Sequence, residues 1–345
     1  MRIVYGIQST GKGHLSRFLG LKPFFDRDGH ELLVLASGYD DPPEYFVKAI
    51  SNCRYARLRG ISYMGDDCGG ISKRRTVCAF ARHLPELLAG FGRAQALIAE
   101  FGPEVVISDF DPISGSIFVA PAIPKLGLSH QNTLMIPGMY HPPRMYVEKL
   151  FTWAVLHTFT DGLGHKLGCH FYPANDLCLP PIIRPAIRDA VTENRGHIVV
   201  YHTMPGLLDG FRQYAADHPD SRLIIYGYAR QEDTRNIHFE SDRGKFASDL
   251  ARAEAYVGTA GFQSICEAFY LGKKIAVRPI AGQYEQIWNA AQLEYWGMGR
   301  WHRGSLEQAL DQQFDRELHA RLHPWFRDGA RICYERVMEL AVRAR

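Results

Sequence analysis

The chain has 345 residues, of which 46% are hydrophobic and 22% are charged, and its formal net charge is +3. These values suit a globular protein with two domains, and the basic residues are spread along the chain, unlike those of a nucleic-acid-binding surface. There is no run of about 20 apolar residues, no signal-peptide pattern at the start and no Cys-x-x-Cys pair among seven cysteines, so we expect a cytoplasmic protein with reduced thiols and without structural zinc.

The first third of the chain alternates short apolar runs with helical patterns. Residues 3–7 form an apolar run, a glycine-rich loop and a helical pattern follow it, and residues 30–36 form the next run. A second helical pattern covers 84–99, and 105–109 is another strand with a polar end. This order predicts an α/β fold in which a doubly wound domain surrounds a parallel sheet.

A proline-rich segment separates this series from a second one. Residues 179–185 contain three prolines, which favour an extended linker. Strand patterns then recur at 197–201, 223–227, 255–258 and 274–277. We therefore expect an N-terminal, acceptor-binding domain at 1–180, a linker at 181–196 and a C-terminal domain at 197–327. The two would face each other across a cleft at the carboxyl ends of their strands. A final helix at about 324–345 is expected, with 328–345 packing back on the N-terminal domain.

The richest segment is 258–289, where the strand at 255–257 ends in a loop of small residues that opens a helix. Small residues let a phosphate approach the backbone, and the amides and dipole of the helix N-terminus favour an anion. The sequence therefore predicts a diphosphate site. Ser264-x-x-Glu267 also has the spacing of a capping box, which would stabilise a helix without any ligand.

As a set, these residues resemble the donor signature of GT-B glycosyltransferases, whose architecture is two facing Rossmann-like domains. The resembling branch includes the lipid-II-forming N-acetylglucosaminyltransferase and the natural-product and UDP-glycosyltransferases. The matching positions are Gly261, Phe262, Gln263, Ser264, Glu267, Ala268, Gly272, Pro279, Glu285, Gln286 and Asn289. The resemblance implies that Gly261 to Ser264 hold the diphosphate, that Glu267 accepts bonds from the ribose, and that Glu285 and Gln286 bind the sugar.

Further nucleotide contacts are expected at the ends of neighbouring strands. Thr259 stands where plant-type members of the family place a histidine, and the strand ending at Phe239 matches the segment that contacts the base. Thr203, in the first loop of the second domain, is either a phosphate contact or part of an ordinary turn. A UDP- or dTDP-sugar is the expected donor, and it is a substrate, so no cofactor is expected.

The N-terminal loop allows three interpretations. Residues 6–12 nearly match a P-loop, but Gly13 stands where a magnesium-binding hydroxyl belongs. Gly11-x-Gly13-x-x-Ser16 is similar to a dinucleotide fingerprint, but no acidic residue ends the next strand. Gly-x-Gly-His-x-x-Arg resembles the first loop of the same GT-B branch, which agrees with the C-terminal half. On this interpretation Gly13 lies near the diphosphate.

The same resemblance makes His14 the general base, because histidine titrates near working pH. Asp109 would orient its imidazole, as a carboxylate does in a catalytic triad. Asp109-Phe110-Asp111 also spells a metal-binding D-x-D motif, which we interpret as a coincidence, so no metal is expected. His130 and Gln131 follow a strand at 126–128 and are candidate acceptor-binding residues.

The sequence thus predicts a metal-independent, inverting glycosyltransferase that moves a sugar from a nucleotide donor to an acceptor hydroxyl. The acceptor would be a small molecule or lipid-linked, with peripheral membrane contact open and no nucleic-acid partner. Two alternatives remain: a nucleotide-sugar 2-epimerase of the same fold, and a non-catalytic nucleotide-sugar-binding auxiliary protein.

Overall fold

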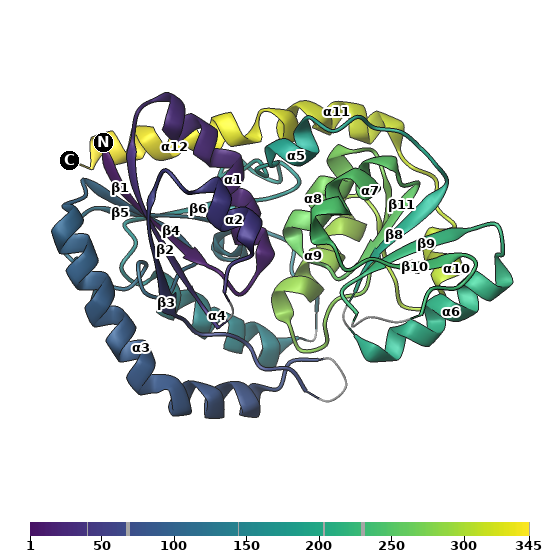
Figure 1. Cartoon of the computed structure of the whole chain (residues 1–345), viewed down its shortest axis with the longest axis horizontal. Coiled ribbons are helices and arrows are strands. Elements are labelled where there is room, and N and C mark those ends of the chain that lie inside the picture. The colour runs from purple at the N-terminus through teal and green to yellow at the C-terminus, as the bar shows by residue number, and fades with distance from the viewer. Residues whose placement is uncertain (40, 67–69, 144, 203, 229–231, 345) are drawn as a thin grey trace.

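Two parallel sheets form the framework of the protein, seen side by side in Figure 1. The computed structural model describes residues 1–39, 41–66, 70–143, 145–202, 204–228 and 232–344. The first sheet has the order β3-β2-β1-β4-β5-β6-β7 and the second β10-β9-β8-β11-β12-β13. The predicted fold of two doubly wound, Rossmann-like domains is confirmed.

The strands occupy the apolar runs of the sequence. In the first sheet they are β1 (Arg2–Gln8), β2 (Glu31–Gly38), β3 (Arg54–Arg59), β4 (Val105–Asp109), β5 (Lys125–Ser129), β6 (His165–Cys169) and β7 (Cys178–Leu179). In the second they are β8 (His197–Tyr201), β9 (Arg222–Tyr226), β10 (Ile237–Phe239), β11 (Ala255–Gly258), β12 (Lys274–Val277) and β13 (Arg300–Trp301). Strand order reverses beside β1 and β8, and in such sheets ligands bind at the carboxyl ends of the strands near that point.

Helices cover the sheets on both sides. Those of the first half are α1 (Lys12–Arg27), α2 (Glu44–Ala49), α3 (Lys73–Phe101) and α4 (Tyr146–Thr160). The later helices are α5 (Pro185–Arg188), α6 (Leu208–Asp217), α7 (Phe246–Arg252), α8 (Phe262–Tyr270), α9 (Tyr284–Tyr295), α10 (Leu306–Leu310), α11 (Arg316–Arg327) and α12 (Gly329–Arg343). Short 3₁₀ turns lie at Gln131–Met135, Pro205–Leu207 and Arg243–Lys245. Among the helices of the described ranges, none combines the length and apolar composition that a bilayer crossing requires.

One hydrophobic cluster runs through both halves. It includes Phe18 of α1, Ile265 and Phe269 of α8, and Val337 of α12. Helix α12 packs on α1 and on strands β5 and β7, and it lies along the first half in Figure 1, which places the two termini close together. The C-terminal helix therefore packs on the N-terminal sheet, as the sequence predicted.

Contacts at the other end of the interface join two loops. The loop between β3 and α3 meets the loop between β12 and α9, where the N–H of Ile71 donates to the carbonyl oxygen of Ala281 at 2.8 Å. The two halves are thus in contact on both sides of the space between them.

Two predicted helix boundaries were wrong. The helix predicted over 84–99 begins eleven residues earlier, at Lys73, because the hydroxyl of Ser72 caps it by accepting from the N–H of Arg75 at 3.2 Å. The single final helix predicted from residue 324 is two helices, and α11 ends at Arg327 before Asp328. Pro324 lies inside α11 rather than at a helix start.

Candidate active site

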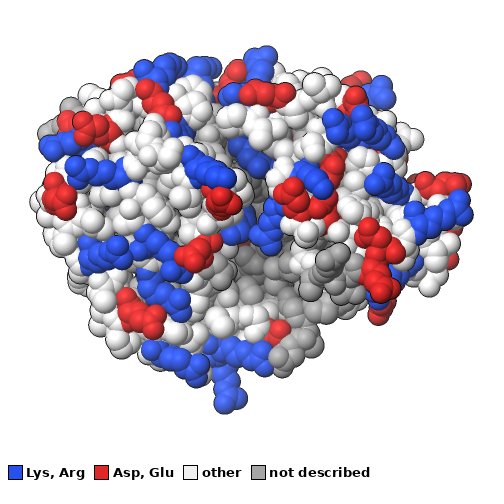
Figure 2. Space-filling view, viewed as in Figure 1, with Lys and Arg blue, Asp and Glu red and all other residues white. Residues whose placement is uncertain are grey.

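A cavity of about 1190 Å³ lies between the two halves. Figure 2 shows the surface hollowed there, with Lys and Arg side chains beside the hollow. Most of the predicted site residues line this cavity, although they come from distant parts of the chain: Gly13, His14, His130, Gln131, Thr259, Gly261, Phe262, Gln263, Ser264, Glu267, Glu285 and Gln286. The fold therefore brings the two glycine-rich loops to one place.

His14 lies in the first turn of α1 and is paired with Asp109 at the end of β4. Its Nδ1 is 2.8 Å from Oδ1 of Asp109, whose side chain is fully buried. Register explains the pairing, because Ile7 of β1 is the partner of Asp109 in β4, and α1 begins just after β1. When Nδ1–H donates to the carboxylate, Nε2 is left as a proton acceptor that faces the cavity.

Arg17 contacts the same carboxylate and is a site residue whose role the sequence did not reveal. Its guanidinium donates to Oδ1 of Asp109 and lies 3.3 Å from Nδ1 of His14. Burial opposes the charge on Arg17, but the neighbouring carboxylate of Asp109 outweighs it, and the pKa of Arg17 is raised. The guanidinium of Arg17 and the imidazole of His14 thus contact the same oxygen of Asp109, and the two contacts together hold the carboxylate in one orientation.

Gln131 links this pair to the second half of the protein. Its amide nitrogen lies 3.4 Å from Nε2 of His14 and 3.1 Å from Oε2 of Glu285. Burial raises the pKa of the Glu285 carboxyl, while His14 and the bond from Gln131 oppose that shift. The predicted base, an acceptor-side amide and a predicted sugar-binding carboxyl therefore lie within contact of one another. Gln286 is engaged elsewhere, because its amide oxygen accepts from the N–H of Ile280 at 3.0 Å.

Asp111 does not join Asp109 in a common site. Its carboxylate accepts from the hydroxyl of Ser37 and, at 2.8 Å, from the N–H of Ser114. Burial raises its pKa. The two carboxylates of the D-x-D motif therefore serve different neighbours, and among the described residues no cluster of three potential metal ligands occurs.

Two helix N-termini meet at the cavity. Gly11 precedes α1 and Gly261 precedes α8, and neither helix start has a side-chain cap. Gly13 permits the approach of the two loops, since a Cβ added there would lie 3.3 Å from Cβ of Gln263. Backbone N–H groups without an intrahelical partner are suited to bind an anion such as a diphosphate.

The capping-box alternative for α8 is wrong. Ser264 lies inside the helix, and its hydroxyl donates to the carbonyl oxygen of Gly261 at 3.0 Å. Glu267 instead accepts two bonds from Arg184 of the linker, at 2.9 and 3.2 Å, and one from Gln263 at 3.3 Å. Both Glu267 and Arg184 line the cavity, so a ribose would meet a carboxylate that is already held in place.

Basic side chains outnumber acidic ones around the cavity. Among the described residues that line it, the Lys and Arg side chains are Lys12, Arg17, Arg184 and Arg243, and the carboxylates are Glu267 and Glu285. Arg17 and Arg184 are ion-paired with Asp109 and Glu267, so the positive charge complementary to a ligand with two phosphate groups comes mainly from Lys12 and Arg243.

His130 joins the two halves and has no ring nitrogen left for an acceptor, in contrast to its predicted role. Its Nδ1 lies 2.8 Å from the carbonyl oxygen of Cys169 and its Nε2 2.7 Å from the amide oxygen of Asn289. Its ring stacks on Phe262, with centroids 3.8 Å apart. Burial lowers the pKa of His130 to about 3.

Phe239, at which a contact with the base is predicted, does not line this cavity. It packs against the hydrophobic cluster of the second sheet, and its N–H donates to Asp233 at 2.8 Å. Tyr201, Arg243 and Phe246 line the cavity on that side, and no sequence motif identified them. Thr203 lies outside the described residues.

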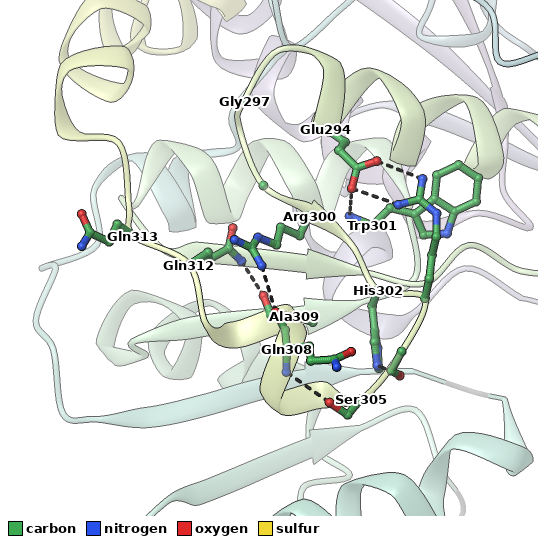
Figure 3. Close-up of a pocket in the computed structure, with 13 residues that line it drawn as sticks. Glu294, Gly297, Arg300, Trp301, His302, Ser305, Gln308, Ala309, Gln312 and Gln313 are labelled. Carbon is green, nitrogen blue, oxygen red and sulfur yellow. Dashed lines mark hydrogen bonds and ion pairs between the residues drawn. The ribbon is translucent and has the colours of Figure 1, made fainter.

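A second pocket, of about 550 Å³, lies around β13 and α10 (Figure 3). Its polar side chains are bonded to one another: Arg303 pairs with Glu294 at 2.9 Å, and its guanidinium lies 4.1 Å from the ring centroid of Trp301. None of the predicted site residues lines it. The larger cavity is therefore the candidate active site.

Comparisons with known proteins agree with this geometry. The model of the family described as "Glycosyl transferase family 1" matches residues 1–318. Among curated proteins, none matches the chain. The structure of the calicheamicin glycosyltransferase CalG4 is similar with a TM-score of 0.61 and 16% identity, over 99% of this chain and 98% of that one.

Two further solved structures have the same architecture. The glycosyltransferase of kitacinnamycin has a TM-score of 0.66 and 14% identity, over 98% of each chain. Phytolacca americana UGT2, complexed with UDP-2-fluoro-glucose and pterostilbene, has a TM-score of 0.64 and 14% identity, over 99% of each chain. With a family match over 318 residues and a GT-B fold throughout, the chain belongs to glycosyltransferase family 1.

Proposed function

We propose that this glycosyltransferase moves a sugar from a nucleoside diphosphate donor to an acceptor hydroxyl, with His14 as the general base. One observation carries the proposal: His14, which is paired with the buried Asp109, lines the same cavity as the uncapped N-terminus of α8. A base for the acceptor and a cradle for the leaving diphosphate are the two elements that such a transfer needs.

The reaction is a single displacement. Nε2 of His14 takes the proton of the acceptor hydroxyl, and the acceptor oxygen forms a bond to the anomeric carbon. The bond from that carbon to the diphosphate oxygen breaks, and the nucleoside diphosphate leaves with the electron pair. N–H groups of α8 and the surrounding basic side chains stabilise its developing charge. A displacement of this kind inverts the anomeric configuration and, with the phosphate charge met by protein groups, needs no metal.

Two solved relatives guide the choice of donor. One was complexed with UDP-2-fluoro-glucose and another, the Streptomyces glycosyltransferase SsfS6, with thymidine diphosphate. We therefore propose a UDP- or dTDP-sugar as the donor of this chain. We also propose a cytoplasmic location, in keeping with the scattered cysteines of the sequence.

The test begins with a thermal-shift screen of UDP-, dTDP- and GDP-sugars, since a ligand that binds the native state raises Tm. The donor that binds is then used with His14→Ala, which should lower kcat by about 10²–10⁴-fold and leave the shift by the nucleotide unchanged. The exposed His165 provides a control as His165→Ala. Undiminished transfer by His14→Ala would refute the assignment of the base, and consumption of donor without acceptor would indicate an epimerase.

A further inference from the structure

Helices α3 and α4 each expose a stripe of large apolar side chains. In α3 the exposed fractions are 57% for Val77, 41% for Phe80, 38% for Leu84 and 60% for Leu88. In α4 they are 79% for Tyr146, 65% for Val147, 68% for Leu150 and 51% for Trp153. The spacing of three or four residues places each set along one side of its helix. Single exposed apolar residues are ordinary, but two such stripes indicate a binding surface.

The two stripes belong to one face, which we call the α3–α4 face. Lys73, the first residue of α3, donates to Glu148 in the first turn of α4 at 3.2 Å. Figure 1 shows both helices along the lower edge of the first half. Both helices also line the candidate active site, through Val77 and Phe80 and through Phe151 and Val155. The apolar surface therefore continues from the outside of the protein into the cavity.

Basic residues lie beside one end of this apolar surface and along the other side of α3. Between residues 73 and 93, α3 carries five of them and a single acidic residue, Glu86, which is bound to Arg59. The basic residues are Lys73, Arg74, Arg75, Arg82 and Arg93. Figure 2 shows Lys and Arg side chains along the corresponding lower edge. Helix α4 adds the exposed Lys149.

We propose that the α3–α4 face docks on a membrane surface that contains anionic lipids. Exposed aromatic and aliphatic side chains with basic residues beside them are the composition of interfacial helices, which combine apolar insertion with attraction to anionic head groups. A second copy of the chain fits less well. A symmetric contact through this face would bring the basic residues of both copies together, and like charges at an interface repel.

The position of this face has a consequence for the acceptor, which rests on the proposed function. An acceptor with a long apolar chain lies in the bilayer, and its hydroxyl-bearing head can reach His14 through the cavity. Its chain would then contact the apolar residues that both helices contribute to the cavity wall. The face thus points to a lipid-borne hydroxyl as the acceptor class.

Docking is measured by co-sedimentation of the full chain with vesicles of phosphatidylcholine alone or with phosphatidylglycerol added. We expect binding to the anionic vesicles that weakens at high salt. Arg74→Glu combined with Lys149→Glu should lower the partition coefficient by about 25-fold or more, since removal of one basic residue typically costs about fivefold and these changes also reverse the charge. Leu150→Glu combined with Trp153→Glu should lower it by about 10-fold or more, because both side chains would insert.

Matched controls lie on the opposite helices. Val342 of α12 is 60% exposed and serves as Val342→Glu. Arg316 and Arg321 of α11 are exposed and serve as a paired reversal to Glu. Circular dichroism and the Tm of each variant without ligand verify that it is folded.

Three results would overturn docking. These are no sedimentation with anionic vesicles, equal losses in the α11 and α12 controls, and a dimer in analytical ultracentrifugation that Leu150→Glu dissociates. Vesicle binding is scored without turnover, so its failure is distinct from a failure of the proposed transfer.

Discussion

The carboxylate of Asp109 is the residue on which the site geometry depends, because it binds His14 and Arg17 through one oxygen. Its other oxygen, Oδ2, is buried without a hydrogen-bond partner. A buried carboxylate held in this way orients the imidazole and selects the tautomer with the proton on Nδ1. The proposed base, Nε2 of His14, thus depends on a carboxylate that does not itself line the cavity.

Asp109→Asn should lower kcat by about 10²–10⁴-fold, because an amide can present its N–H to the imidazole and select the wrong tautomer. The donor-induced thermal shift should persist. Asp111→Asn is the matched control: it loses one buried hydrogen bond, which costs about 1–3 kcal/mol of stability, but its kcat should be that of the parent. Steady-state kinetics on both variants check this. Equal losses of kcat, restored by added divalent cation, would favour a D-x-D metal site instead.

Among single residues, His14 was predictable because it lies in a motif of fixed spacing, and Asp109 because it ends a predicted strand. It did not assign a role to Arg17, since a contact 92 residues apart depends on how β4 lies beside β1. Phe239 does not line the cavity, and the contact with the base predicted there stays a prediction. Its strand is at the edge of the sheet, and the residues that line the cavity there, such as Phe246, come from the next segment.

Among the elements, α8 is anchored to the linker by the pair of Arg184 and Glu267. The exposed side-chain fractions are 17% and 3%, so the pair is largely buried. Removing one partner from such a pair leaves a buried charge without compensation, whereas replacing both with apolar groups can be neutral. The linker therefore positions the helix at which we propose the diphosphate binds.

Glu267→Ala should lower the free energy of unfolding by about 3–5 kcal/mol. Arg184→Met combined with Glu267→Leu should recover most of this loss. Urea titration of the two single variants and the double variant measures the coupling. Losses below about 1 kcal/mol in both single variants would mean that the pair behaves as an exposed one.

Helices and strands could be predicted where neighbouring residues alone determine them. The strand runs and the Gly-rich loops are local, and they match β1, β8 and β11. Helix α3 was underestimated at its start: the predicted helix began at residue 84, next to Pro85, whereas the structure continues the helix through that proline from Lys73. The break at Asp328 is marked by the adjacent Gly329, but the apolar pattern continues on both sides of it and concealed the break.

Across the whole molecule, buried neutral histidines make stability dependent on pH. Burial lowers the pKa of His130 to about 3 and those of His141, His170 and His202 to about 4. The unfolded values lie near 6.5, so between pH 6.5 and about 4 the unfolded chain binds more protons than the folded one. Stability contributed by these groups is present above pH 6.5 and is lost as the pH falls.

Tm should therefore decrease steadily from about pH 6.5 to about pH 4.5. His170→Asn isolates one contribution, since an amide can retain the contacts of Nδ1 with Tyr172, at 2.8 and 3.1 Å, but does not titrate. Its Tm should fall less steeply over this range. Differential scanning calorimetry at several pH values provides the slopes, and identical slopes for variant and parent would contradict the assignment.

The close approach at Gly329 has a mechanical consequence. The chain passes between the halves twice, after β7 and between α11 and α12, and the two passages touch: a Cβ on Gly329 would lie 2.0 Å from the carbonyl oxygen of Pro181. Because the two passages touch at Gly329 and Pro181, this contact can act as the pivot of a hinge. The two halves can then rotate about it, whereas sliding of one half past the other is restricted. Such a rotation moves the halves apart most at the point farthest from the pivot, where Ile71 contacts Ala281. We therefore expect substrates to enter on that side, past the hydrogen bond between Ile71 and Ala281, while the helices near the pivot keep their packing.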